Sequence, residues 1–348
     1  MVGKNSWTVA TLLLLFAGRA FSIEPWIEVA KQTTTRAPRI LLTYDMEGLS
    51  GQDDVSSAEP EEVAAYQKGR RLLTDDVNAV IRGLFDGGAK AVTVVDGHGG
   101  GNRTIDVLQD ELDARVQLIK QVPFDAYVDP VKPGAYDAVV AVGMHPKSGS
   151  GGFWAHTYTY GIEISFNGHA VSESEFVALA YGAADIPLIF VSGDDLLGES
   201  LKSLSWIEYV AVKKSTGPDS AALYPVSEMH KALSAGAKRS VRRLAAAKVL
   251  KLRLPAEVRV SAIKPWDMSW LGRIPGVNYR DNGVTFTAQE FPDAYRGIKA
   301  LSAGTVFNYY DVIEKAVHDL PDAAAIELQL EREYKRMWLE AERSRLPR

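Results

Sequence analysis

Histidine and carboxylate residues are concentrated in one part of this sequence of 348 residues. Asp45 and Glu47 lie two residues apart, and four of the six histidines fall between residues 98 and 169, namely His98, His145, His156 and His169. Imidazole nitrogens and carboxylate oxygens are ligands that divalent metals accept in proteins. Because the chain contains no cysteine, thiol nucleophiles, disulfides and cysteine-based metal sites are excluded.

Three of these residues follow short apolar segments that predict strands. Asp45 directly follows the first segment, and His98 and His145 follow the second and third. Glu47 comes two residues after Asp45, so strand alternation would point both side chains the same way. Open parallel sheets bind ligands at the carboxyl ends of their strands. We therefore expect these four side chains to converge at one edge of a sheet, as a metal site requires.

Each motif has a second interpretation when it is taken alone. The stretch from Asp45 to Gly48 is also typical of turns and helix caps. The glycine-rich stretch 96–101 could form a flexible turn or cradle a phosphate through backbone N–H groups, although it matches neither nucleotide-binding fingerprint. His145 could be a packed core histidine. Only their combination favours a carboxylate–imidazole metal site. Three other histidines are interpreted as surface or packing residues: His169, His230 and His318.

The elements that must position these side chains are predicted from apolar segments. Four short runs with β-branched residues recur at 40–44, 91–95, 138–142 and 186–191. Near-continuous apolar runs are typical of strands buried on both faces, and apolar residues at three- and four-residue steps predict a helix over 61–85. Such β-α-β units predict an α/β fold with a mostly parallel sheet flanked by helices. One hairpin interrupts the pattern, with Asn167-Gly168 as its tight turn.

The remaining segments differ in character from this catalytic α/β domain, which we expect over residues 39–215. A basic start, a short apolar run and small residues near the end predict a signal peptide and hence a secreted or periplasmic protein. No later run is apolar enough to span a membrane. The predicted segments are a signal peptide at 1–22, a linker at 23–38, a smaller α+β domain at 216–320 and a charged C-terminal helix at 321–348. Within the smaller domain we expect helices near 227–247 and 289–304 and strands at 249–254 and 283–287.

The composition is that of an ordinary folded protein. Hydrophobic residues make up 46% and charged residues 24%, which excludes disordered, collagen-like and coiled-coil classes. A formal net charge of -5 gives nucleic-acid binding little electrostatic drive, and the basic residues of 238–251 are interpreted as a solvated helix face. The chain has no Gly-x-Ser-x-Gly elbow and no His-Glu-x-x-His helix, which argues against serine-hydrolase and zincin mechanisms.

Taken together, the motifs resemble those of peptidase family M55, the zinc-dependent D-aminopeptidases of the dipeptide-operon type. The resemblance rests on the order and spacing of Tyr44-Asp45-Met46-Glu47-Gly48-Leu49-Ser50-Gly51, Val95-Asp96-Gly97-His98-Gly99-Gly100-Gly101-Asn102, Gly143-Met144-His145, Ala155-His156-Thr157 and Val171-Ser172-Glu173. It continues through Asp185-Ile186-Pro187, Ser192-Gly193-Asp194-Asp195 and Val212-Lys213, and more weakly to residue 305.

The resemblance implies a site with two zinc ions in each subunit. The implied ligands are Asp45, Glu47, His98, His145 and Glu173. Asp45 would bridge the two ions, and Glu173 is preferred over Glu175 because its spacing to the Asp185-Ile186-Pro187 motif fits the family. In general, two zinc ions polarise a scissile carbonyl, hold an activated water and can anchor a substrate amine.

Three other residues receive roles around the zinc ligands. The family's additional active-site histidine falls on His156, which would be free to move a proton or to steady an oxyanion. Its replacement by alanine should retain the metal and lose turnover. Asp96 and Asn102 are candidates for orienting His98 or the loop that carries it.

Two departures from the family pattern bear on function. After Val212-Lys213 the family usually carries an arginine, whereas this chain continues through Ser215 to Ala221 without one. Substrate preference is therefore open at this point. The leader is the second departure, because the resemblance implies a cytoplasmic protein, as the familiar members of the family are.

The resemblance thus implies an exported zinc aminopeptidase that hydrolyses short peptides with an N-terminal D-residue, of the D-Ala type. Its other implied property is assembly into a homo-oligomer, such as a decameric ring, with no membrane contact after leader cleavage. The alternatives are an L-specific or broad small-peptide metalloaminopeptidase, a non-catalytic exported metal- or peptide-binding protein, and a dinuclear phosphoesterase supported only by the glycine-rich loop.

Overall fold

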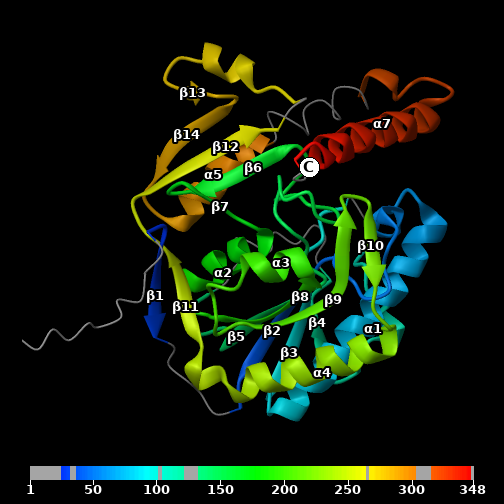
Figure 1. Cartoon of the computed structure of the whole chain (residues 1–348), viewed down its shortest axis with the longest axis vertical. Coiled ribbons are helices and arrows are strands. Elements are labelled where there is room, and N and C mark those ends of the chain that lie inside the picture. The colour runs from blue at the N-terminus through cyan, green and yellow to red at the C-terminus, as the bar shows by residue number, and fades with distance from the viewer. Residues whose placement is uncertain are drawn as a thin grey trace, which may run out of the picture.

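A seven-stranded sheet forms the centre of the computed structural model, which describes residues 25–31, 37–100, 104–120, 132–263, 266–302 and 315–345 (Figure 1). The strand order is β10-β9-β8-β5-β2-β3-β4, and all neighbours are parallel except the edge pair β10 and β9. The strands are β2 (Arg39–Tyr44), β3 (Ala91–Asp96), β4 (Gln117–Leu118), β5 (Ala138–Val142), β8 (Leu188–Asp194), β9 (Glu208–Gly217) and β10 (Ser220–Leu223).

Helices cover both faces of this sheet. On one face α1 (Val63–Gly87) packs against α4 (Val226–Arg242), and on the other lie α2 (Glu173–Gly182) and α3 (Asp195–Ser200). Within β2, Ile40 and Leu42 pack in the same core cluster as α1 and α4, whereas Leu41 packs in the cluster that contains α2. Because both faces of each central strand are buried, its residues are apolar without alternation.

A second sheet lies above α2 in Figure 1 and is antiparallel, with the order β13-β14-β12-β6-β7. Its strands are β6 (Ile162–Phe166), β7 (His169–Ala170), β12 (Ala256–Ala262), β13 (Asn278–Arg280) and β14 (Gly283–Ala288). Two helices accompany it, α5 (Phe291–Ser302) and the C-terminal α7 (Ala323–Arg343). The remaining elements are the antiparallel pair β1 (Ile27–Lys31) and β11 (Lys248–Leu252), and the short 3-10 helices η1 (Val55–Ala58), η2 (Gln109–Glu111), η3 (Leu244–Ala246) and η4 (Ser269–Arg273). The predicted fold class, a mostly parallel α/β sheet with a smaller α+β part, is confirmed.

The path of the chain between the two sheets differs from a simple division at residue 215. The hairpin of β6 and β7 has the predicted Asn167-Gly168 turn, but β6 pairs with β12 of the second sheet. Conversely, α4 packs on the large sheet although it follows residue 215, and β9 continues to Gly217. Each part therefore contributes an element to the other: β6 pairs in the second sheet, and α4 packs on the large sheet. Pairing with β12 stabilises the β6–β7 hairpin, which would be marginally stable alone.

The expected linker at 23–38 is wrong for Ile27–Lys31. These residues form β1 and pair in register with β11, from Ile27 opposite Leu252 to Lys31 opposite Lys248. Pairing satisfies backbone groups that a linker would leave to water. The expected signal peptide at 1–22 lies outside the described residues. Among the residues that are described, no helix has the length and apolarity needed to cross a bilayer.

Candidate metal centre

Parallel register aligns the carboxyl ends of three neighbouring strands. Tyr44, the last residue of β2, lies opposite Asp96 of β3 and Val142 of β5. The alignment continues one residue further, because the Asp45 N–H donates to the Val142 carbonyl at 2.8 Å and the Gly97 N–H donates to the Tyr44 carbonyl at 3.0 Å. The loops that leave these strands therefore start side by side, as the sequence predicts.

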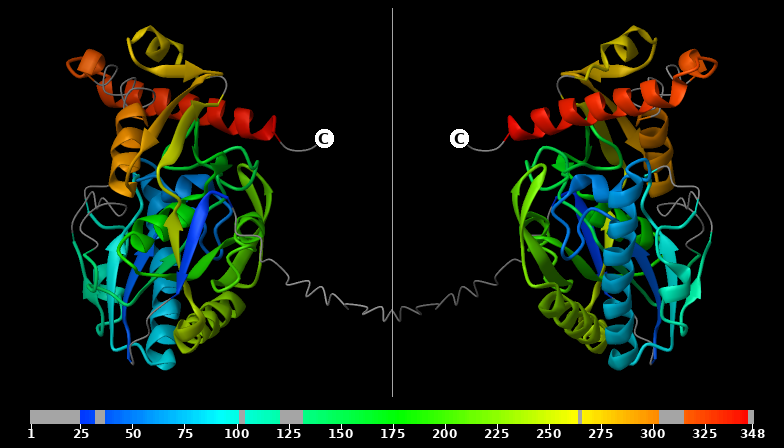
Figure 2. Two further views of the ribbon diagram at one scale, coloured as in Figure 1. Left: turned by 90° about the vertical axis from the view of Figure 1, so that its left-hand side faces the viewer. Right: turned by 90° about the vertical axis from the view of Figure 1, so that its right-hand side faces the viewer.

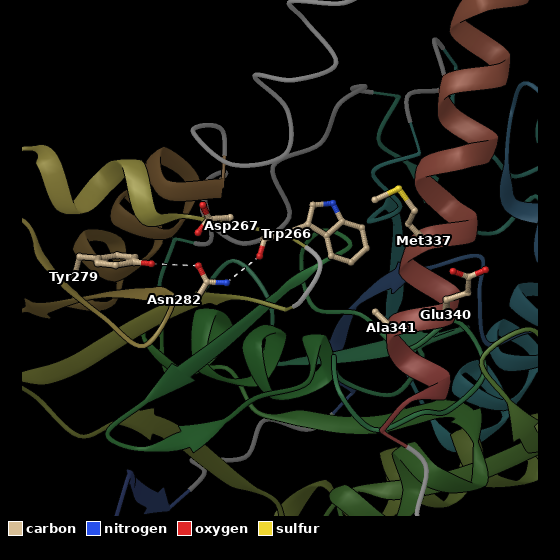
Figure 3. A pocket seen from close by; sticks show the side chains of 7 residues that line it. All are labelled: Trp266, Asp267, Tyr279, Asn282, Met337, Glu340 and Ala341. Atoms are coloured by element: carbon tan, nitrogen blue, oxygen red, sulfur yellow. Dashed lines mark hydrogen bonds between the residues drawn. The ribbon is translucent and has the colours of Figure 1, made fainter.

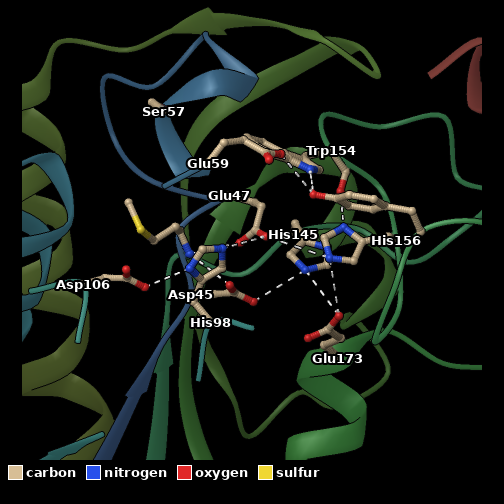
Figure 4. Close-up of polar contacts among 12 residues, drawn as sticks. Asp45, Glu47, Ser57, Glu59, His98, Asp106, His145, Trp154, His156 and Glu173 are labelled. Atoms are coloured by element: carbon tan, nitrogen blue, oxygen red, sulfur yellow. Dashed lines mark hydrogen bonds and ion pairs between the residues drawn. The ribbon is translucent and has the colours of Figure 1, made fainter. Parts of the chain in front are cut away.

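All six residues predicted for the site come together (Figure 4). Their donor atoms form three overlapping groups, each within 4.8 Å: Asp45 with Glu47 and His98, Asp45 with His145 and Glu173, and Glu47 with His145 and His156. Asp45, Glu47 and His145 each belong to two of these groups, so the groups form one continuous cluster. His156 joins the third group beside the predicted ligands.

The spacing of these donor atoms fits zinc. His145 Nε2 lies 3.5 Å from Asp45 Oδ2 and 3.6 Å from Glu173 Oε1, and it is a buried atom with no hydrogen-bond partner. His98 Nε2 lies 3.8 Å from Glu47 Oε1. Two ligands bound to one zinc at about 2.0–2.1 Å are roughly 3.3 Å apart. The distances thus exceed those of hydrogen bonds and approach those of ligands around a shared cation.

Hydrogen bonds at the far side of each imidazole leave Nε2 free as a ligand. His98 Nδ1 donates to Asp106 Oδ2 at 2.8 Å, and His145 Nδ1 donates to the Pro146 carbonyl at 3.1 Å. A carboxylate or carbonyl in this position fixes the tautomer and orientation of a metal-binding histidine. The residues present therefore fit a zinc site in tautomer as well as in spacing.

Asp106 is a functional residue that the sequence analysis missed. It is fully buried, and no spacing rule connects it with His98. The predicted partner Asp96 instead holds the backbone, because its carboxylate accepts from the His98 N–H at 3.0 Å and from the Asp106 N–H at 2.9 Å. Asp96 therefore positions the loop that carries His98, as predicted. Asn102 lies outside the described residues.

The N-terminus of α2 distinguishes the two candidate glutamates. Glu175 closes a capping box with Ser172 and contacts His169 Nε2 at 3.0 Å. Glu173, the first residue of the helix, points into the site, where its Oε1 accepts from the Tyr158 N–H at 2.6 Å. Glu173 therefore faces the histidines, while Glu175 stabilises the helix end.

His156 is held in a distinct way from the other site histidines. Its ring stacks on His145 with centroids 3.9 Å apart, and its Nδ1 donates to the Trp154 carbonyl at 2.8 Å. Trp154 and Tyr158 on either side have positive φ angles of 53° and 69°. Such conformations are costly for bulky residues and cluster at functional sites. The local chain is thus constrained so that the imidazole enters the site.

Burial and mutual charge set the electrostatics of the cluster. Burial, together with the charge of Asp45, raises the pKa of Glu47 well above its usual value. Burial alone would raise the pKa of Asp45, but the neighbouring Glu47 carboxyl and the imidazoles of His145 and His98 outweigh it and hold the pKa of Asp45 far below its usual value. Burial and the charge of His145 lower the pKa of His156. The neutral form of His156 is therefore favoured, and because Nδ1 donates to the Trp154 carbonyl, the lone pair lies on Nε2.

The helix α7 lies beside the second sheet (Figures 1 and 2), and its Trp338 packs against His156 of the site. Trp338 is fully buried and stacks on Tyr160 with ring centroids 4.3 Å apart. It also packs edge-to-face with His156, with ring centroids 6.1 Å apart. One turn on, Glu342 accepts from the Gly149 N–H at 2.9 Å and the Gly151 N–H at 3.2 Å. These glycines belong to the loop that joins His145 to His156, so α7 holds that loop in place.

A neighbouring face of α7 borders an outer hollow. Met337, Glu340 and Ala341 line a hollow of about 760 Å³ together with Trp266, Asp267, Tyr279 and Asn282 (Figure 3). Arg343 pairs with Asp219, which lies in the stretch where the family arginine is missing. The helix therefore lies between the candidate site and an outer hollow. Its Arg343 places a cation beside residues 215–221, the stretch that lacks the family arginine.

The three remaining histidines lie apart from this cluster. His169 stacks on Trp26 at 3.9 Å, and His230 Nε2 lies 3.2 Å from Asp76 Oδ1. His318 is exposed beyond α5. Their positions agree with the predicted surface and packing roles.

The fold and site define an α/β protein with a buried imidazole–carboxylate cluster at the ends of parallel strands. The family model of peptidase family M55, described as D-aminopeptidase, matches residues 39–300, and the chain belongs to this family. The predicted resemblance is thereby confirmed.

Two individual proteins are similar to this chain. A D-aminopeptidase of Bacillus subtilis (strain 168) is 26% identical over 168 residues, a match that covers 48% of this chain and 60% of that protein. The solved structure of the Zn-dependent D-aminopeptidase DppA from Bacillus subtilis, described as a self-compartmentalizing protease, has a TM-score of 0.69 at 20% identity and covers 76% of this chain and 96% of its own. The structural similarity supports the α/β fold. The family match ends before α7 begins.

Proposed function

We propose that this protein is an exported dinuclear zinc aminopeptidase that hydrolyses short peptides with an N-terminal D-amino acid. The observation that carries the proposal is the position of Asp45, which is shared by two groups of three donor atoms. One group contains Glu47 and His98, and the other contains His145 and Glu173. The zinc dependence and the preference for D-residues are supported by the family and by the names of the two similar proteins.

The chain's own residues supply the other requirements of peptide hydrolysis. When bound, the zinc ions would polarise the scissile carbonyl and lower the pKa of a water. Asp45, Glu47 and Glu173 place three carboxylates where two dications need charge compensation. The neutral imidazole of His156 takes up or returns a proton at Nε2, which lies 3.8 Å from Glu47 Oε1 and 3.7 Å from Glu173 Oε1.

Two properties of the proposal concern the whole molecule. Assembly into a homo-oligomer, such as a decameric ring, is supported by the description of the similar structure as self-compartmentalizing. A ring would restrict access to short peptides. Export to the periplasm or the medium is supported by the apolar leader sequence.

A comparison of two dipeptides tests the proposed reaction. Amine release from D-Ala-D-Ala and from L-Ala-L-Ala is measured with zinc-loaded protein and with chelator-treated protein. We expect chelator-sensitive cleavage of the D-dipeptide, because the proposed mechanism needs a metal ion to polarise the carbonyl and activate the water.

The other outcomes separate the alternatives. Cleavage of the L-dipeptide alone would retain the metal mechanism and contradict the stereochemical assignment. Zinc binding without cleavage of either dipeptide would indicate a binding protein or, if phosphate esters are hydrolysed, a dinuclear phosphoesterase.

A further inference from the structure

Lys213 is a buried cation that the proposed reaction leaves without a role. It is 0% exposed and is the only buried lysine or arginine among the residues that the structure describes. Burial lowers the pKa of Lys213 to about 7, which reflects the cost of removing an ammonium group from water. A buried charge persists only where the surrounding groups compensate it.

A register shift turns Lys213 inward. β8 and β9 pair regularly up to Gly193 and Ala211, but the next pair is Asp194 with Lys213. Val212 is thus an extra residue, and both Val212 and Lys213 are fully buried. Bulges of this kind redirect side chains and are common next to active sites.

All three N–H groups of the Lys213 ammonium have acceptors on one loop. Nζ donates to the Glu47 carbonyl at 2.7 Å, to Gln52 Oε1 at 2.9 Å and to the Gln52 carbonyl at 3.2 Å. Nζ also lies 3.8 Å from the ring centroid of Phe153, and the charges of Asp194 and Glu47 favour the ammonium form. With every proton committed, Lys213 does not transfer one to a substrate.

Gln52 extends the same contacts along the loop. Its Nε2 donates to the Met46 carbonyl at 2.6 Å and to Ser57 Oγ at 2.9 Å, while Oε1 also accepts from the Leu49 N–H at 3.2 Å. Lys213 and Gln52 together therefore fix the consecutive carbonyls of Met46 and Glu47, within the segment that carries the carboxylates Asp45 and Glu47.

We propose that Lys213 is a positioning residue of the metal centre, which holds the 45–52 loop in the conformation that presents Asp45 and Glu47 to zinc. This inference rests on the proposed function, since it assigns zinc to that loop. It predicts that Lys213 sets zinc affinity through the loop geometry, without direct contact with the metal or the substrate.

The adjacent lysine provides a matched control. Lys214 is the next residue of β9, and its side chain is exposed. Full-length wild type, Lys213→Met and Lys214→Met are compared by zinc competition against a chromophoric chelator, and by thermal unfolding of the zinc-free proteins. We expect zinc affinity to fall about 10- to 100-fold in Lys213→Met, as for other residues that orient metal ligands. Lys214→Met should stay within about twofold of wild type, as expected for a surface substitution.

A second variant covers the case in which Lys213→Met does not fold. Gln52→Leu removes the same loop contacts from the other side and should weaken zinc binding in the same direction. In the double variant the losses should be less than additive, because both side chains act on one loop.

Three outcomes decide between the hypotheses. Folded Lys213→Met or Gln52→Leu protein with wild-type zinc affinity and only reduced thermal stability would show that the lysine supports the fold alone. Equal weakening in Lys214→Met would also overturn the inference. Wild-type protein that binds no zinc would contradict the proposed function itself, and the inference with it.

Discussion

The two halves of the candidate site are built in different ways. One half, formed by Asp45, Glu47, His98 and His145, lies at the ends of β2, β3 and β5, where parallel register alone brings the loops together. The other half consists of His156, Glu173 and Trp338, which come from an irregular loop, the first turn of α2 and the C-terminal helix. The first half follows from sheet architecture, whereas the second depends on contacts that cross between distant segments. We expect the strand-end half to supply most of the metal ligands, which Glu173 completes, and His156 and Trp338 to govern turnover.

The largest effect should come from the residue that both donor groups share. Replacing Asp45 with asparagine removes a charge from each group, so zinc affinity should fall on the order of 1,000-fold or more. Zinc content after dialysis against a dilute chelator measures the loss. Retention of two ions per subunit in Asp45→Asn would contradict the bridging role.

Replacing His156 tests the other half. His156→Ala should keep its zinc and lose about 10²- to 10⁴-fold in kcat, because proton transfer contributes that much in other enzymes. Steady-state kinetics with parallel metal analysis separates the two effects. A variant that loses zinc would place His156 among the ligands and remove the proposed difference between the halves.

The two glutamates of α2 sharpen the comparison within a single turn. Glu173→Gln should lower kcat/KM about 100-fold through loss of a charged ligand, whereas Glu175→Gln should leave kinetics intact and change the free energy of unfolding by less than about 1 kcal/mol, because glutamine can still close the capping box. Kinetics and urea unfolding are measured on both variants. Equal kinetic losses would mean that the first turn of α2 acts as a whole.

Replacing Asp106 tests whether zinc binding by the strand-end half depends on the hydrogen bond to His98 Nδ1. Asp106→Asn keeps the shape of the side chain but weakens the hydrogen bond to His98 Nδ1, and zinc affinity should fall about 10- to 100-fold. Chelator competition gives the value. An unchanged affinity would show that the loop backbone held by Asp96 is sufficient to orient His98.

The smallest effect on activity is expected at α7. Trp338→Ala should lower kcat about tenfold by loosening Tyr160 and His156, while zinc affinity remains that of wild type. The control is Met337→Ala, since its side chain is 37% exposed and lines the outer hollow. If both variants match wild type, α7 does not contribute to turnover.

The positions of three central strands were predictable because buried parallel strands carry continuous apolar runs. The runs at 40–44, 91–95 and 138–142 correspond to β2, β3 and β5 within one residue at each end. Asp45, Glu47, His98 and His145 were predictable for the same reason, since each follows such a run. His156 and Glu173 required the family resemblance, because no periodicity locates a residue on an irregular loop.

The sequence by itself therefore determined the class of fold and the side chains that line the ends of its strands, because local patterns of hydrophobicity and turn residues encode both. Only the tertiary structure decided which distant groups support them. Asp106 reaches His98 through a loop, Lys213 turns inward through a register shift in β9, and Trp338 arrives from a helix more than 180 residues after His156. These contacts depend on how elements pack in three dimensions, where sequence separation carries no information about distance.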